Sequence, residues 1–99
     1  MNIKQRVEND EVIVAVEGDI DTTTASAFSE ALQKAAQDAM TLVVDFKHVN
    51  YISSAGLRVL LSGQKIMNDK KGKMIVRNVN EDIMEVLELT CFTEILTIE

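Results

Sequence analysis

Residues 40–46, MTLVVDF, and residues 54–78, SAGLRVLLSGQKIMNDKKGKMIVRN, decide the fold of this chain. The first stretch is a nearly continuous apolar run, which is typical of a strand buried on both faces. The second predicts a helix over 54–69, ended by Gly72, and then a strand over 73–78. A strand, a helix and another strand in this order form a parallel unit, whose crossover is right-handed in nearly all proteins.

The segments on either side of this unit also alternate between strands and helices. In chain order we expect a weak strand over 3–8, a turn at Asn9-Asp10, a strong strand over 12–17, a helix over 22–39, a third helix capped by Asn80, and an edge strand over 93–98. The predicted fold is therefore a single α/β domain spanning residues 1–99. Its sheet is mixed and mostly parallel, with about five strands and three main helices in the order β-β-α-β-α-β-α-β.

The composition of the chain excludes several classes of function. A net charge of -6 repels phosphate backbones, so we expect no nucleic-acid partner. No apolar run approaches the ~20 residues that span a bilayer, so no membrane segment is expected. The single cysteine, Cys91, allows no intrachain disulfide, which fits a reducing, cytoplasmic compartment. One histidine and one cysteine leave few groups for catalysis, and we expect no cofactor and no metal site.

The most informative segment is the loop that follows the buried strand and leads into the helix at Ser53 and Ser54. Ligands of open α/β sheets favour the carboxyl ends of strands, and free N–H groups at a helix N-terminus favour anions. A phosphate on either serine would therefore be tolerated, and it would add about -1.5 to -2 charge units at pH 7. The ordinary alternative is that the serine pair only caps the helix. The segment 18–21 ends the preceding strand and could lie at the same sheet edge.

The start of this helix also has features that suit a partner. Ala55 and Gly56 keep it bare, so that another backbone can approach. A helical wheel places Leu57 and Leu61 on the flank, where they form either a partner-facing ridge or ordinary packing at the edge of the core. The inward face comprises Gly56, Leu60, Gly63 and Met67, with Val59 and Ile66 beside them; the wet face comprises Arg58, Ser62, Lys65 and Asp69.

Together these motifs make the chain resemble the anti-sigma-factor antagonists (anti-anti-sigma factors) of the STAS-domain superfamily. The resemblance covers almost the whole chain. The matching residues are GDID at 18–21, VVDF at 43–46, VNYISSAGL at 49–57, Gly72, and the bend at Asn78-Val79.

This resemblance implies a partner-switching mechanism. The unphosphorylated antagonist binds an anti-sigma factor that is also a serine-protein kinase, and binding frees the sigma factor. The kinase phosphorylates a serine at the start of the second helix, which breaks the complex, and a PP2C-type phosphatase reverses the modification. Ser54 matches the family phosphoacceptor, and Asp21 matches an acidic residue close to it. Many members carry Asp immediately before the acceptor; here Ser53 takes that position and becomes a competing acceptor.

The residues expected to bind the partner are Asp21, Ser53, Ser54, Ala55, Gly56, Leu57, Arg58 and Leu61. Another hypothesis within the same superfamily is an interaction or scaffold module in a different regulatory assembly, stressosome-like or regulating secretion, without direct control of a sigma factor. An enzyme is disfavoured because a nucleophile elbow needs a glycine two residues before the serine, where Ile52 stands. The only base nearby, His48, is expected to be an exposed loop residue.

Overall fold

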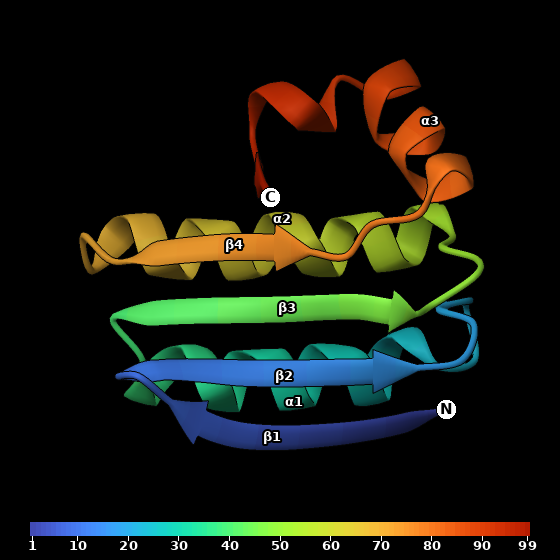
Figure 1. Cartoon of the computed structure of the whole chain (residues 1–99). Helices are drawn as coiled ribbons and strands as arrows, with labels where there is room; N and C mark the ends of the chain where they lie inside the picture. The colour runs from blue at the N-terminus through green and yellow to red at the C-terminus, as the bar shows by residue number, and fades with distance from the viewer.

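A mixed five-stranded sheet with three α-helices forms the frame of the molecule (Figure 1). The computed structural model describes all residues 1–99. Its elements are β1 (Asn2–Glu8), β2 (Glu11–Glu17), α1 (Ala25–Asp38), β3 (Thr41–His48), α2 (Ser54–Asp69), β4 (Lys73–Arg77), α3 (Glu81–Leu89), a 3₁₀ turn η1 (Phe92–Glu94), and β5 (Thr97–Ile98). The spatial order is β1-β2-β3-β4-β5, with β1 antiparallel to β2 and all other neighbours parallel. The predicted fold class and element order are confirmed.

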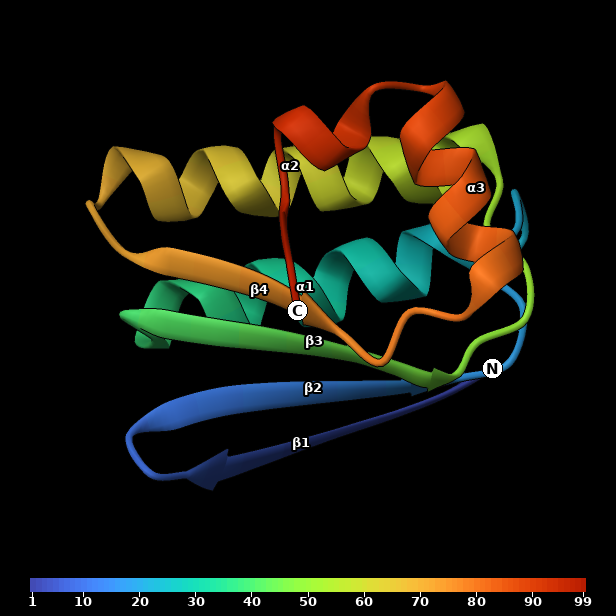
Figure 2. The same cartoon turned by 45° about the horizontal axis from the view of Figure 1, so that its top comes forward.

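The main core lies between the sheet and the helices α1 and α2, which run along the same face of it (Figure 2). Alternate residues of β3 enter this core, among them Val44 and Phe46, which are fully buried. Val43 points to the opposite face, where it is buried beside Ile13 and Ile75 of the neighbouring strands. The strand is therefore buried on both faces, as its unbroken apolar run predicts.

Three boundaries differ by two or more residues from those predicted from sequence. Strand β3 continues to His48, two residues past the predicted end at Phe46. Helix α1 begins at Ala25 rather than at residue 22, because Asp21 holds the next three residues in a separate turn. The last strand is only β5, since the chain first makes the turn η1 after Cys91, which is exposed and has a φ of 63°. The predicted turn at Asn9-Asp10 is confirmed, and both residues have positive φ, as a two-residue hairpin loop requires.

Candidate functional site

The candidate site is built where two distant segments meet at the carboxyl ends of β2 and β3. The N–H of Gly18 donates to the carbonyl of His48 at 3.0 Å, and that of Ile20 donates to Tyr51 at 2.9 Å. The N–H of Ser53 in turn donates to the carbonyl of Ile20 at 2.8 Å. Ile20 and Ile52 thus form a one-residue parallel bridge. The expectation that residues 18–21 lie beside the serines is confirmed, and the start of α2 is fixed to the end of β2.

Gly56 serves this junction rather than a partner. A Cβ at this position would lie 2.6 Å from Cγ2 of Ile20 and 2.7 Å from Cγ1 of Ile52, which is too close for any side chain. Gly56 itself is buried. The expectation that it leaves the helix start open to another backbone is therefore wrong, because the chain's own isoleucines fill that space.

The two serines have different environments, although the sequence leaves both open as phosphate acceptors. Ser53 is the N-cap of α2: it has extended backbone, it is half-buried, and its Oγ accepts from the N–H of Gly56 at 3.3 Å. Ser54 is the first helical residue and is exposed, and its hydroxyl makes no hydrogen bond. The N–H groups of Ser54 and Ala55 have no acceptor within the protein, as expected for the first turn of a helix. The free hydroxyl and the free amides therefore lie together at Ser54.

Asp21 is a fixed negative charge at the adjoining turn. Its Oδ1 accepts from the hydroxyl of Thr23 at 2.6 Å, from the N–H of Thr23 at 2.9 Å, and from the N–H of Thr24 at 3.1 Å. The bond from the Thr23 hydroxyl and those from the two amides hold the pKa of the Asp21 carboxyl below its ordinary value. Asp21 directly follows Ile20, whose carbonyl binds the N–H of Ser53, so the charge is held close to the start of α2.

The exposed side of α2 carries a short stripe, which we call the α2 face and define as Ser54, Arg58 and Leu61. Their spacing of four and three residues places them on one side of the helix. Arg58 makes no ion pair, and Leu61 is 41% exposed.

Leu57 is not part of this surface. It is only 6% exposed and belongs to the main core, while Ala55 is half-buried against the same core. The expectation that Leu57 and Leu61 form one partner-facing ridge is wrong for Leu57. The core that contains Leu57 also includes Ile83 and Leu87 from α3. It therefore extends beyond the space between the sheet and α1. Of the residues expected to bind a partner, those that remain exposed or half-exposed are Asp21, Ser53, Ser54, Ala55, Arg58 and Leu61.

Two further residues belong to the site, although the sequence does not single them out for it. Tyr51 is 52% exposed in the loop just before the serines. A large aromatic residue in such a loop is a sequence signal that could have indicated a contact surface. Asn80 caps α3 by accepting from the N–H of Ile83 at 2.9 Å, as predicted, and its Nδ2 also donates to the carbonyl of Val49 at 3.0 Å. This second bond ties α3 to the loop, and it cannot be anticipated from local sequence because 31 residues separate its ends.

The arrangement gives no support to a nucleophilic site. His48 is exposed, as predicted, but it is the last residue of β3 rather than a loop residue. Its side chain makes no hydrogen bond with either Ser53 or Ser54. No group of three or more His, Cys, Asp or Glu side chains is placed to hold a metal ion. None of the helices is both long and apolar enough to cross a bilayer.

Comparison with known families agrees with this fold. The family model described as "STAS domain" matches residues 2–99. The chain belongs to the STAS domain family. The matched range includes both segments of the junction at Ile20 and Ile52 and the whole of α2. The site thus lies within the range that the STAS domain model matches.

Individual relatives of this STAS domain carry consistent names. An "Anti-sigma-B factor antagonist" from Listeria monocytogenes is 26% identical over 100 residues, which cover 100% of this chain and 87% of the relative. The structure of an anti-sigma factor antagonist from Mycobacterium paratuberculosis superimposes with a TM-score of 0.89 at 22% identity, covering 98% of this chain and 83% of that one. The Bacillus cell fate determinant SpoIIAA in its phosphorylated form has a TM-score of 0.75 at 14% identity, covering 99% and 91%. At these identities the solved structures show that the fold is shared.

Proposed function

We propose that this STAS domain is an anti-sigma factor antagonist controlled by phosphorylation of Ser54. In its unphosphorylated form it binds an anti-sigma factor that is also a serine-protein kinase, through the α2 face and the neighbouring Asp21 and Tyr51. Binding releases the sigma factor, and transfer of phosphate to Ser54 breaks the complex. The observation that carries the proposal is the free, exposed hydroxyl of Ser54 at the first position of α2. The names of the relatives, several of them anti-sigma factor antagonists, support the choice of partner.

Ser54 is suited to a reversible modification because its surroundings accept a phosphate in the free protein. The unpaired N–H groups of Ser54 and Ala55 favour an anion at the helix N-terminus. Arg58 stands one turn further along the same face and makes no ion pair that a phosphate would have to displace. An exposed position is also open to a PP2C-type phosphatase, which in this proposal restores the binding form.

The complex responds to the same phosphate in the opposite way. A phosphate of about -1.5 to -2 charge units that is enclosed between two proteins loses its water. Unless the partner supplies a cation at that point, an enclosed charge costs several kcal/mol, which exceeds what a modest interface can offset. The modification therefore favours the separated proteins while it leaves the antagonist folded.

The decisive experiment is phosphorylation by the anti-sigma factor kinases encoded in the chain's own genome, each purified and supplied with ATP. We expect one of them to add one phosphate, which peptide mapping places on Ser54. The Ser54→Ala variant should accept none, whereas the matched Ser53→Ala variant should still be labelled. Labelling of Ser54→Ala at the wild-type rate would overturn the assignment. Equal affinity of the kinase for the phosphorylated and unphosphorylated forms would overturn the switch itself.

A further inference from the structure

The outer edge of β1 is free along its whole length. β1 is the outermost strand of the sheet and pairs with β2 alone, in a register that brings Glu8 opposite Glu11 across the two-residue turn. The residues that close such a turn exchange both of their hydrogen bonds, and bonded and non-bonded pairs then alternate along the hairpin. The N–H and C=O groups of Ile3, Gln5 and Val7 therefore point outward, away from β2. They form a row of unpaired donors and acceptors.

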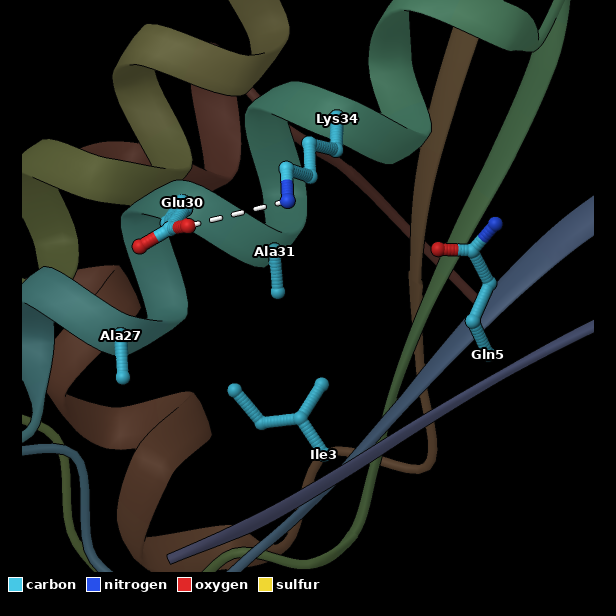
Figure 3. A pocket seen from close by; sticks show the side chains of 6 residues that line it. All are labelled: Ile3, Gln5, Ala27, Glu30, Ala31 and Lys34. Carbon is cyan, nitrogen blue, oxygen red and sulfur yellow. Dashed lines mark ion pairs between the residues drawn. The ribbon is translucent and has the colours of Figure 1, made fainter.

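A hollow of about 320 Å³ lies beneath this edge, between β1 and α1 (Figure 3). Its lining residues are Ile3, Gln5, Ala27, Glu30, Ala31 and Lys34. In Figure 3, Ile3 from the strand and the small side chains of Ala27 and Ala31 from the helix point toward the same space. Glu30 and Lys34 form an ion pair at 3.7 Å along the helical wall. The floor is thus apolar and shallow, with room for small apolar side chains.

We propose that the free edge of β1 and this hollow form a docking site for an extended segment of a partner protein, which adds to the sheet as a sixth strand. The backbone of the added strand pairs with Ile3, Gln5 and Val7, and its alternate side chains enter the hollow above Ala27 and Ala31. The added strand also covers Val7, an apolar side chain that is 72% exposed in the free protein.

The charges of β1 identify the chemistry of this segment. Lys4 and Arg6 alternate with the edge residues and project from the opposite face of the sheet, where they would stand beside the outward side chains of an added strand. Arg6 already pairs with Glu8 of the same strand at 3.0 Å, but both side chains are more than half exposed, so this pair is weak, and Lys4 makes no ion pair. Acidic side chains at those positions of the added strand therefore form favourable cross-strand pairs with Lys4 and Arg6. The partner segment therefore alternates small apolar with acidic residues.

The same cations argue against a second copy of this chain as the occupant. An antiparallel pair of β1 strands centred on Gln5 brings Lys4 opposite Arg6 of the copy, and centring it on Lys4 or Arg6 brings each opposite itself. The register centred on Ile3 avoids like charges but pairs only residues 1–5 and leaves the exposed Val7 uncovered. The register centred on Val7 also avoids like charges, but it runs into Asn9, whose φ of 52° cannot continue a strand. Cations on an edge strand are a common protection against such self-pairing.

The test uses the full chain and two acetylated, amidated heptapeptides. One alternates glutamate with valine or alanine, and its matched control has lysine in place of glutamate. Binding is followed by amide chemical shifts in ¹⁵N-labelled protein. We expect the glutamate peptide to shift the signals of β1 and of the α1 residues around Ala31, and to bind about tenfold more tightly than the lysine peptide.

Three variants distinguish docking at this edge from non-specific peptide binding. Gln5→Pro removes an edge-facing N–H that β2 does not use, so the protein should stay folded and lose peptide binding. Ala31→Leu fills the hollow and should have the same effect, whereas Gln33→Leu, on the exposed side of α1, should bind as the wild type does. Equal binding of the two peptides, or shifts that map to α2 instead, would refute the proposal. A dimer that Gln5→Pro converts to monomers would also refute it and would make a second copy the occupant.

Discussion

Leu57 and Leu61 offer a sharp test of how α2 divides between packing and binding. They are the same residue type one helical turn apart, but Leu57 is 6% exposed and Leu61 is 41% exposed. Truncating Leu57 to alanine leaves a cavity in a core of 24 residues, and buried leucine truncations cost about 2–5 kcal/mol in unfolding free energy. Truncating Leu61 removes a side chain that water already reaches, so its cost is about 1 kcal/mol or less.

The assay combines thermal unfolding with calorimetric titration against the anti-sigma factor. For a domain of this size each kcal/mol shifts the melting temperature by about 4–8 °C. Leu57→Ala should therefore melt roughly 10–30 °C lower than the wild type, and Leu61→Ala no more than about 8 °C lower. Measured at a temperature where both variants are folded, Leu61→Ala should lose affinity by about fivefold or more, as truncation of an interface residue does. Leu57→Ala should bind within about twofold of the wild type.

Either of two results would refute this reasoning. If Leu61→Ala destabilises the protein as much as Leu57→Ala, the α2 face is covered by the protein itself and is not a contact surface. If folded Leu57→Ala loses affinity while Leu61→Ala does not, the partner contacts the other flank of the helix.

Three further predictions concern the junction and the switch. Gly56→Ala should lower the unfolding free energy by about 1–2 kcal/mol in urea titrations, because the clash with Ile20 and Ile52 outweighs the gain in helix propensity; an unchanged midpoint would contradict the close packing. The pKa of Asp21 is lowered on folding, so the unfolded chain binds more protons and stability falls as the pH drops through the acid range. Asp21→Asn should flatten that slope below about pH 4, and identical pH profiles would show that the Thr23 and Thr24 bonds do not hold the carboxylate. Ser54→Asp should keep the melting temperature or raise it slightly, and it should weaken binding to the anti-sigma factor at least tenfold; wild-type affinity would count against control by charge.

Those features of the fold that depend on local chemistry could be predicted from the sequence. The bounds of α2 coincide with the prediction, because a serine cap, an apolar period and a glycine three residues beyond its end all agree. The double burial of β3 follows from its unbroken apolar run. The cap of α3 follows from Asn80 and the acidic residues in its first turn.

The features that could not be predicted from the sequence depend on contacts between segments far apart in the chain. Leu57 is buried in a 24-residue core that includes residues of the sheet and of the other helices, and a helical wheel of α2 contains no information about them. The role of Gly56 depends on Ile20, which lies 36 positions earlier and approaches only through the bridge to Ile52. The late start of α1 depends on which partners the Asp21 carboxylate takes, since Thr23 and Thr24 compete with continuation of the helix.

The geometry also indicates how the proposed phosphate on α2 would act. The segment before α2 is held by bonds to two other parts of the chain, the segment 18–21 through Gly18 and Ile20, and the start of α3 through Asn80. The hydroxyl of Ser54 takes part in none of these bonds. Phosphate on Ser54 would therefore break no bond of the free protein, and under the proposed function its effect on a partner would arise at the contact itself. Phosphate on Ser53 would instead disturb the N-cap bond from the N–H of Gly56 to the Ser53 Oγ, and loss of such a cap costs about 0.5–2 kcal/mol of stability. It would therefore disturb the start of α2 as well as the contact with the partner. The proposed switch, which must be reset many times, is better served by the serine whose modification leaves the fold unchanged, and of the two serines that is Ser54.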